Sequence, residues 1–592
     1  MNKEQQEEIK KPIKVDYPEF NIEDPVEYQK ELDKITDQCF INAGTTRTIK
    51  NIRETLDAKL RTKYGLKNGA RKAAADEILK IQGLHEHNFD LLSNFSLFIN
   101  DPHINNKSID DNANKSERNL KGVLAELALP FNKLIGYDYL YRVMVELYGK
   151  TKAKELSGSM YDFSLAINDS TGIMNPYCYC LDASKLVTIG RDFGKVHSGP
   201  AHRVATYIST LGDTIRELSF NLMGALAIGT FFEDIAHLLI YKERIPLHVL
   251  KENKSERKRI ANLFQQFIYT VNHYSRNANE SPFTNISCFD HDKLKNLIGP
   301  DNYGWYFPKK TQALVDNNLG GEDYKLSQED WEEFVIDYIM TLQEMYIDVF
   351  DAGDPLQDGL QFPFPVTTCN ISVEIKDGKR TVAEPNRLID YISKKDISRY
   401  NIYANEGTKL CSCCRLISDP EEFKSYASSV NSFGGSSVSL GSCRVVTINF
   451  QRIACEATDY EHFKKIINKR VDNAAKILKA QRILVLKMKD KGLHPFIKNG
   501  WINFNRMFGT FGCIGYLEAD RLLKMKFGNP DFDYMKDFMI YFNQKCAEKF
   551  AEKDENGNRI YSFPYNIEQI PGESMAPKLA KVDKLLFDDK RI

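Results

Sequence analysis

The stretch "SCRVVTINFQRIA" (Ser442–Ala454) is rich in β-branched residues and is followed by a helical pattern over Tyr460–Met488. Upstream, a helical pattern over Glu329–Phe350 precedes a second strand-like stretch, "PFPVTTCNISVEI" (Pro363–Ile375). Val, Ile, Thr and Phe favour extended backbone, whereas apolar residues spaced three and four apart favour helices. Strands that alternate with long helices predict an α/β fold with a largely parallel sheet.

Composition and charge exclude several classes of protein. The 592 residues carry a formal net charge of −1, so no global positive field attracts a nucleic-acid backbone. The longest apolar run, Leu222–Phe232, falls short of the ~18 residues that cross a bilayer. The segment Met1–Phe20 lacks the apolar core of a signal peptide. We therefore expect a cytoplasmic protein with neither a membrane nor a direct nucleic-acid partner.

One polar segment divides the chain. Residues Asn100–Ser116 are rich in Asn and Asp and are typical of a loop. We therefore predict a helical N-terminal region over residues 1–110 and an α/β domain over residues 111–592. Within that domain, the apolar spacing predicts a further long helix over Ala201–Leu239.

Three of the 12 cysteines lie within "KLCSCCRL" (Lys409–Leu416). A zinc site needs pairs of thiolates from two places, but Cys443 and Cys455 are isolated, so no metal site is predicted. Cys411 and Cys414 have the spacing of a redox pair but not its strand-to-helix context. On local sequence alone, structural thiols on a loop are favoured.

Six segments change this interpretation because they occur together and in a fixed order. They are "YSRNANESPFTNISC" (274–288), "QFPFPVTTCNIS" (361–372), "KLCSCCRL" (409–416), "GGSSVSLGSCRVVTINFQRIA" (434–454), "GTFGCIGYLEA" (509–519) and "YNIEQIPGESMAPKLAKVDKLLF" (565–587). Over residues 112–587 the chain resembles the catalytic subunit of class III anaerobic ribonucleotide reductases, which are glycyl-radical enzymes. The resemblance implies a ten-stranded α/β barrel.

The resemblance also assigns two thiols. The family carries its thiyl radical on a cysteine followed by arginine at the tip of a central loop, and here Cys414 matches it. A second family thiol lies in a Pro-Tyr-Cys context, so Cys178 in "NPYCYCLDASKL" would be the hydrogen donor on the opposite face of the substrate. The family usually has a His-Asp pair slightly upstream. This chain has Asn168 before Asp169, which leaves a proton-handling role there without support.

Two sets of polar residues are candidates for substrate binding. The first looks like the family's substrate loop ahead of a helix and comprises Gly572, Glu573 and Ser574. The free amides and the dipole of a helix N-terminus suit phosphates, although an ordinary N-cap is the alternative. The second set could hydrogen-bond the ribose or phosphates, or cap a turn, and comprises Ser281, Thr284 and Asn285.

The family's radical glycine lies near the C-terminus in an Arg-x-x-Gly-Tyr context, behind two C-x-x-C pairs that bind zinc. The sequence contains neither, since Gly512 occupies the arginine position in "FGCIGYLEA". We expect the large part of a split enzyme, with the glycyl radical and the zinc on a separate chain. A truncated reading frame and an inactive copy are the alternatives.

The expected activity is the anaerobic reduction of ribonucleoside triphosphates to 2′-deoxyribonucleoside triphosphates. The resemblance implies formate or a dithiol as reductant, ATP or deoxynucleotide effectors, an S-adenosylmethionine-dependent activase and a homodimer. Relatives carry a nucleotide-binding cone domain where residues 1–110 lie here. The alternatives are a glycyl-radical enzyme acting on a non-nucleotide substrate and a non-catalytic nucleotide-binding barrel.

Overall fold

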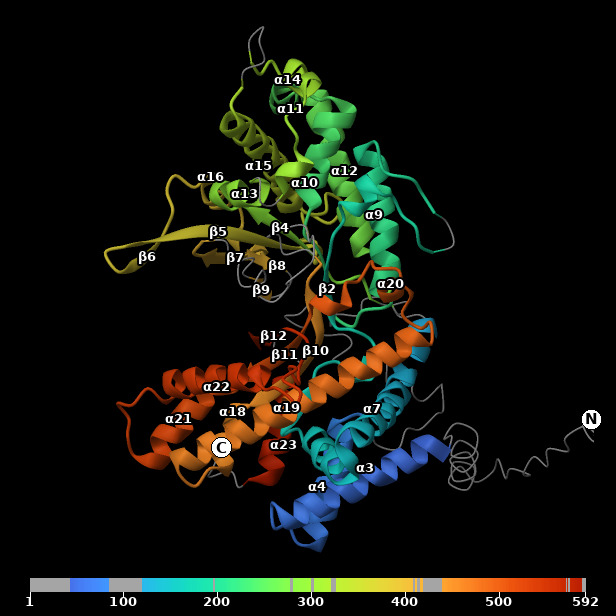
Figure 1. The fold of residues 1–592 in the computed structure, drawn as a ribbon, viewed down its shortest axis with the longest axis vertical. Coiled ribbons are helices and arrows are strands. Elements are labelled where there is room, and N and C mark those ends of the chain that lie inside the picture. The colour runs from blue at the N-terminus through green and yellow to red at the C-terminus, as the bar shows by residue number, and fades with distance from the viewer. Residues whose placement is uncertain are drawn as a thin grey trace, which may run out of the picture.

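A central sheet organises the molecule (Figure 1). The computed structural model describes residues 43–84, 120–194, 197–276, 280–299, 303–320, 326–407, 410–412, 416–418, 439–570, 572 and 575–587. Within these residues the main sheet has ten strands, and β8 and β9 form a separate pair. The α/β prediction and its ten strands are therefore confirmed.

The elements have the following bounds. The strands are β1 (Leu165–Ile167), β2 (Cys178–Leu181), β3 (Leu226–Ile228), β4 (Thr284–Phe289), β5 (Val366–Lys376), β6 (Lys379–Val382), β7 (Tyr400–Asn405), β8 (Leu410–Ser412), β9 (Leu416–Ser418), β10 (Gly441–Asn449), β11 (Met507–Ile514) and β12 (Tyr565–Gln569). The α-helices are α3 (Ala43–Thr62), α4 (Asn68–Ile81), α7 (Leu120–Tyr161), α8 (Lys185–Thr188), α9 (Val204–Ser219), α10 (Phe231–Leu238), α11 (Leu247–Glu252), α12 (Lys254–Asn272), α13 (His291–Ile298), α14 (Thr311–Asp316), α15 (Gln328–Ala352), α16 (Arg387–Ile392), α18 (Phe450–Glu456), α19 (Tyr460–Asp490), α20 (Pro495–Lys498), α21 (Tyr516–Phe527), α22 (Tyr534–Ala551) and α23 (Met575–Leu586).

Two groups of parallel strands meet at one antiparallel junction. Strands β2, β3, β4, β5 and β7 run parallel to one another, and β10, β11 and β12 form the second group. The groups meet where Gly441 and Ser442 of β10 pair with Tyr179 and Cys178 of β2. Further along the same edge of β10, residues 446–448 pair with β1. Strands β1 and β2 thus follow one another along one side of β10, while β11 covers the other side.

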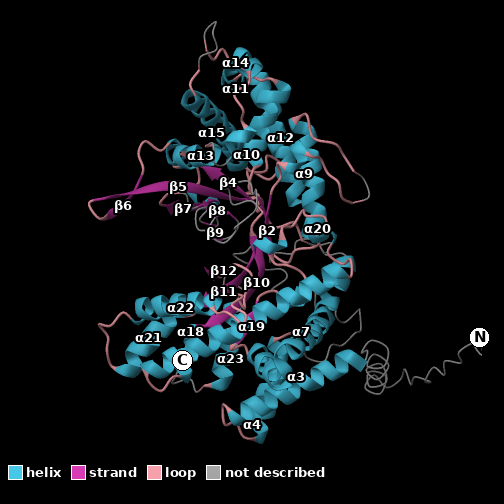
Figure 2. Ribbon diagram, viewed as in Figure 1, coloured by secondary structure: helices cyan, strands magenta, loops and turns pink. Residues whose placement is uncertain are grey.

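Helices cover each group of strands, and the inner strands are buried on both faces, as parallel strands usually are (Figure 2). One core packs α9, α10, α12 and α15 against the β2–β5 group. The other packs α7, α18, α19 and α22 against β10 and β11. The hairpin of β5 and β6 extends away from both cores (Figure 1).

Two local predictions were wrong. The single helix expected over Ala201–Leu239 is instead α9, strand β3 and α10. A three-residue strand between two helices is too short to break their apolar periodicity. The strand expected over Ser442–Ala454 ends at Asn449, because the Asn449 side chain accepts a hydrogen bond from the Arg452 backbone N–H and caps α18.

The N-terminal helices share a core with the main domain. Ile52, Leu56 and Leu60 of α3 are fully buried in the cluster that also contains Val446 of β10. The expected boundary at residue 110 lies outside the described residues, so the two-region division stays a prediction. No helix in the described part of the chain is both long and apolar enough to cross a membrane.

Candidate active site

Cys178 begins β2, where the two groups of strands meet. Its thiol is half-buried, and the backbone N–H of Ala225 lies 3.2 Å from Sγ. The neighbouring backbone is fixed as well, because the Gly224 N–H donates to the Tyr177 carbonyl at 2.8 Å. The sulfur therefore has a set position at the strand junction.

Two glycines make room for this cysteine. A Cβ atom on Gly224 would overlap Sγ of Cys178, and one on Gly441 would overlap the Cys178 carbonyl oxygen. Both are close approaches that glycine alone permits. The sequence analysis singled out neither glycine, because the need for it appears only once β2, β3 and β10 lie side by side.

A buried arginine fixes the segment that leads into Cys178. Arg444 of β10 is fully buried, and its guanidinium donates to the carbonyls of Asn168 (3.0 Å), Asp169 (3.2 Å), Gly172 (2.8 Å) and Asn175. Burial lowers the pKa of Arg444. Since a planar guanidinium presents five donors in a rigid fork, one side chain can hold several turns of an irregular strap.

Asn168 stands where the family's histidine was expected. Its side-chain oxygen accepts from the Thr447 hydroxyl at 2.6 Å, and its backbone N–H donates to the Val445 carbonyl at 3.3 Å. The described contacts of Asn168 are therefore with β10, which fits a structural role.

Strands β4 and β5 contribute a buried polar surface. Asn285 donates to the Thr368 hydroxyl at 2.8 Å, and both side chains are inaccessible to solvent. Cys180 of β2 pairs with Ala227 of β3, and Ala227 pairs with Asn285 of β4, so these three side chains lie on one face of the sheet. Residues two apart on a strand share a face, so Asn285 lies on the face of the sheet to which Cys178 belongs.

The other two residues predicted with Asn285 lie differently. Thr284 is in register with Tyr179 through Leu226, which places it on the opposite face. Its buried hydroxyl has no hydrogen-bond partner among the described residues. The Ser281 hydroxyl donates to the Asn272 carbonyl at 3.0 Å and thus ties the segment before β4 to the end of α12.

The predicted substrate loop follows β12. Gly572 lies three residues before the start of α23 at Met575, and its carbonyl accepts from the Ala576 N–H at 2.7 Å. Glu573 and Ser574 lie outside the described residues. Gln569, the last residue of β12, pairs with Cys513 of β11, which in turn pairs with Ile448 near the end of β10. Cys178 instead pairs with Ser442, near the start of β10. Gly572 therefore lies toward the other end of β10 from Cys178, and the structure does not place the two side by side.

The segment with the expected thiyl cysteine leaves the sheet after β7. Lys293, itself fully buried, donates to the carbonyls of Asn405 (3.0 Å) and Gly407 (2.5 Å) at that exit. Strands β8 and β9 then pair antiparallel, with Ser412 opposite Leu416. Cys414 lies between these strands in the sequence and outside the described residues.

The described residues include no group of three or more His, Cys, Asp or Glu side chains that could hold a metal ion. Cys178 lies among strand ends, glycines and carbonyls, without an adjacent acid or base that the described contacts reveal.

Comparisons with known proteins agree with this arrangement. The family model described as "Anaerobic ribonucleoside-triphosphate reductase" matches residues 111–592. No curated protein sequence matches the chain significantly.

Solved structures share the fold. The anaerobic ribonucleotide reductase from Thermotoga maritima in complex with dATP and CTP is similar with a TM-score of 0.67 and 23% identity, over 92% of this chain and 79% of that one. The same enzyme with citrate in the active site has a TM-score of 0.65 and 24% identity, over 91% and 86% of the two chains. Another chain described as an anaerobic ribonucleotide reductase has a TM-score of 0.66 and 23% identity, over 91% and 77%.

Proposed function

This chain belongs to the anaerobic ribonucleoside-triphosphate reductase family, and we propose that it binds a ribonucleoside triphosphate and reduces it by thiyl-radical chemistry that uses two of its own cysteines, Cys178 and Cys414. Family membership makes it an oxidoreductase that reduces nucleotides through glycyl-radical chemistry. The observation that carries the assignment of Cys178 is its fixed half-buried thiol at the junction of β2, β3 and β10.

In the proposed reaction, the Cys414 thiyl radical takes the hydrogen atom from C3′ of the ribose and becomes a thiol. The C2′ hydroxyl leaves as water, and Cys178 supplies a hydrogen atom to the sugar. Formate or a dithiol supplies the remaining reducing equivalents, and the 3′ hydrogen returns from Cys414. The protein contributes mainly position and exclusion of competing reactions.

The substrate would span the sheet. Its ribose would lie beside Cys178 and Asn285, and its phosphates would reach toward Gly572, Glu573 and Ser574 at the start of α23. A nucleoside triphosphate suits this layout because its reacting sugar and its charged phosphates lie at different places along the molecule. The N-terminus of α23 adds free amides and a positive dipole end for the phosphates.

The proposed reaction also needs a source of the radical and an enzyme that generates it. A separate chain would supply the glycyl radical, the source of the unpaired electron, together with its zinc site. An S-adenosylmethionine-dependent activase would generate that radical. We further propose a cytoplasmic homodimer controlled by ATP or deoxynucleotides, supported by the dATP in the Thermotoga maritima enzyme.

The first test measures nucleotide binding and then turnover. Calorimetry should show saturable binding of CTP or ATP to the unaltered chain, to Cys178→Ser and to Cys414→Ser. After reconstitution with an activase and a glycyl-radical chain, only the unaltered chain should form deoxynucleotide. Cys546→Ser, which alters a buried thiol on α22, serves as the control.

The outcomes separate the alternatives. Turnover by either proposed variant at the normal rate would refute the assignment of that thiol. Failure to bind any triphosphate would favour a glycyl-radical enzyme with a non-nucleotide substrate. Binding without turnover by any reconstituted mixture would favour a non-catalytic nucleotide-binding barrel.

A further inference from the structure

A cavity lies among helices, away from the strand junction at Cys178. It measures about 570 Å³ and lies between α3, α7 and α19. None of the residues described around Cys178 lines it. Its volume is within the ~300–1,000 Å³ typical of sites for small molecules.

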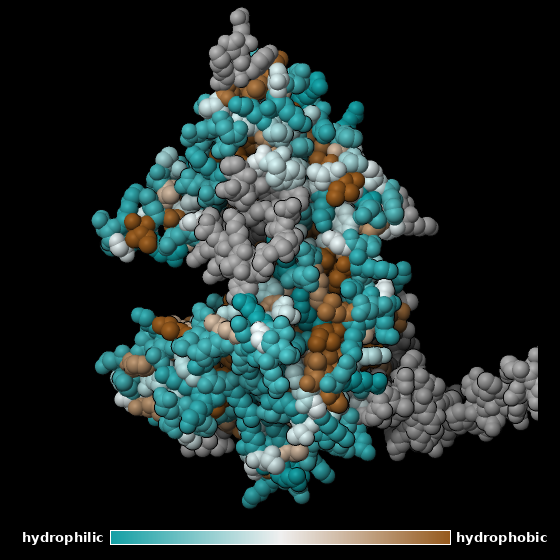
Figure 3. All heavy atoms as spheres, in the orientation of Figure 1, coloured by the Kyte–Doolittle hydropathy of each residue, from teal (hydrophilic) through white to brown (hydrophobic). Residues whose placement is uncertain are grey.

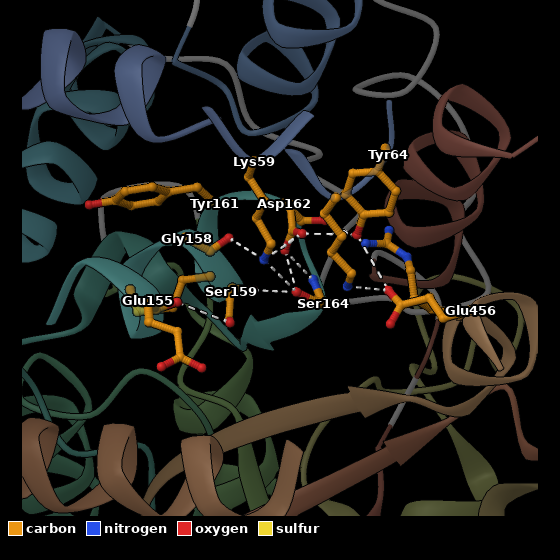
Figure 4. Close-up of polar contacts among 12 residues, drawn as sticks. Lys59, Tyr64, Glu155, Gly158, Ser159, Tyr161, Asp162, Ser164 and Glu456 are labelled. Carbon is orange, nitrogen blue, oxygen red and sulfur yellow. Dashed lines mark hydrogen bonds and ion pairs between the residues drawn. The ribbon is translucent and has the colours of Figure 1, made fainter. Parts of the chain in front are cut away.

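Charged side chains converge beside this cavity, where Lys59 and Asp162 point toward one another (Figure 4). The Lys59 ammonium donates to the Gly158 carbonyl at 3.0 Å and the Ser164 hydroxyl at 3.1 Å, and pairs with Asp162 at 2.6 Å. Lys63 pairs with Glu456 at 2.6 Å. The helix α3 thus brings two cations against the end of α7 and against α18.

The third cation is Arg470, and one of its hydrogen-bond donors lacks an acceptor among the described residues. The Arg470 side chain is 5% exposed, lines the cavity and reaches both Glu456 oxygens through one terminal nitrogen, at 3.1 and 3.0 Å. Its Nε–H has no acceptor among the described residues. An unsatisfied buried donor is destabilising, so an acceptor placed here would be favourable.

The carboxylates of Asp162 and Glu456 already accept hydrogen bonds from other groups, so neither accepts from the Nε–H of Arg470. Asp162 accepts from the Ser164 backbone and hydroxyl groups and from the Tyr64 hydroxyl at 3.1 Å, and it pairs with Lys59. Lys59, Lys63 and Arg470 therefore share two carboxylates, which leaves one excess positive charge and one spare donor among these five side chains. The rest of the lining adds Lys154 and Lys469 and the carboxylates of Glu54, Asp138 and Glu155, of which Glu155 pairs with Lys469 and Asp138 with Arg142.

We propose that this cavity binds a small organic anion, whose phosphate or carboxylate oxygens contact Arg470 and Lys63. Tyr137, Tyr141 and Tyr161 line another part of the cavity, and the rings of Tyr137 and Tyr161 have centroids 5.5 Å apart. These rings provide an apolar surface for the organic part. The site is independent of nucleotide reduction, because it uses none of the residues proposed for that reaction.

The lowered pKa of Lys59 offers a second way to detect a bound anion. The pKa of Lys59 is lowered to about 8, mainly by burial and also by Arg470 and Lys63, against the opposing effect of Asp162. A bound anion would partly cancel the positive field and raise this pKa.

The test uses three probes: inorganic phosphate, phenyl phosphate and phenylacetate. Calorimetry on the full chain should show that phenyl phosphate binds more tightly than inorganic phosphate, because the tyrosines contact the ring. A preference for phenylacetate would identify a carboxylate rather than a phosphate ligand. The absence of saturable binding by all three probes would overturn the proposal.

The matched variants are Arg470→Lys and Lys465→Met. Arg470→Lys keeps the positive charge beside Glu456 but removes the Nε–H donor, so binding should weaken about tenfold. Lys465 is exposed on the same helix and does not line the cavity, so Lys465→Met should bind normally. Equal affinity of Arg470→Lys and the unaltered chain would refute the site.

A second measurement needs no variant. In the unaltered chain with ¹³C-methylated lysines, NMR titration should give a higher pKa for Lys59 with phenyl phosphate than without it. An unchanged pKa at saturating phenyl phosphate would contradict binding next to Lys59.

Discussion

Arg444 and Arg452 are both fully buried, yet they are neutralised in different ways. The described acceptors of Arg444 are backbone carbonyls in the strap before Cys178. Arg452 instead pairs with the buried carboxylate of Asp583 and also donates to the Asp162 carbonyl at 2.7 Å. The first arrangement shapes backbone without placing a carboxylate near the thiol, and the second joins helices.

This difference predicts different costs of disruption. Carbonyls left by Arg444 could in part find water or each other, whereas Asp583 would keep an uncompensated charge. The pKa of Arg452 is raised, since the carboxylates of Asp583 and Asp162 more than offset its burial. The Asp583 pair should therefore contribute more to stability, and Arg444 more to the geometry around Cys178.

The largest effect is expected for Arg452→Met. Removal of one partner of a buried ion pair typically costs about 3–5 kcal/mol, and urea unfolding should show a loss of this size. The double variant Arg452→Met/Asp583→Leu should regain much of it, because no unpaired charge remains. A double variant as unstable as the single one would show that packing, rather than charge, dominates here.

Arg444→Lys should have a smaller effect on stability, of about 1–3 kcal/mol, since one ammonium cannot reach every carbonyl of the strap. It should change the rate at which maleimide alkylates Cys178, measured by peptide mapping. Cys546, a buried residue of α22, provides an internal control. An unchanged Cys178 rate would mean that Arg444 does not position this thiol.

A pH dependence is expected from Lys59. Because its folded pKa is lowered to about 8 by burial, the unfolded chain binds more protons than the folded chain between about 8 and the ordinary lysine pKa. Lys59 therefore makes stability rise with pH across this range. In Lys59→Met the slope of unfolding free energy against pH should be shallower there, and an identical slope would contradict the shift.

The smallest effect is expected for an exposed pair. Arg53 of α3 contacts Asp76 of α4 at 2.8 Å, with side chains 49% and 57% exposed. Arg53→Ala should change the free energy of unfolding by less than about 1 kcal/mol. A loss of stability as large as that of Arg452→Met would show that burial does not determine how much an ion pair contributes to the free energy of unfolding.

The sequence predicts the long elements of the fold well. The helical patterns over Glu329–Phe350 and Tyr460–Met488 correspond closely to α15 and α19. Strands β1 and β3 are three residues each, so they carry too little periodicity to be predicted. Their positions follow from pairing with strands distant in the sequence.

The site was predicted less completely for a different reason. Cys178 could be proposed from its motif, but Arg444 and Gly224 act through contacts between strands that no local pattern reveals. Arginine is usually a surface residue, and its presence inside the apolar "SCRVVTINF" was the available signal. Cys414, Glu573 and Ser574 remain predictions, since they lie outside the described residues.

The arrangement of β10 limits how this protein can change in length. Its two edges are occupied by β11 on one side and by β1 and β2 in succession on the other. The pairing of β10 with β11 already shifts register between Ser442 and Arg444, and one residue inserted beyond this point would turn the following side chains to the opposite face and break the register with several neighbours. The β5–β6 hairpin, which pairs along one edge beyond both cores, can lengthen without such an effect. Insertions that preserve function should therefore accumulate in that hairpin and be rare in β10.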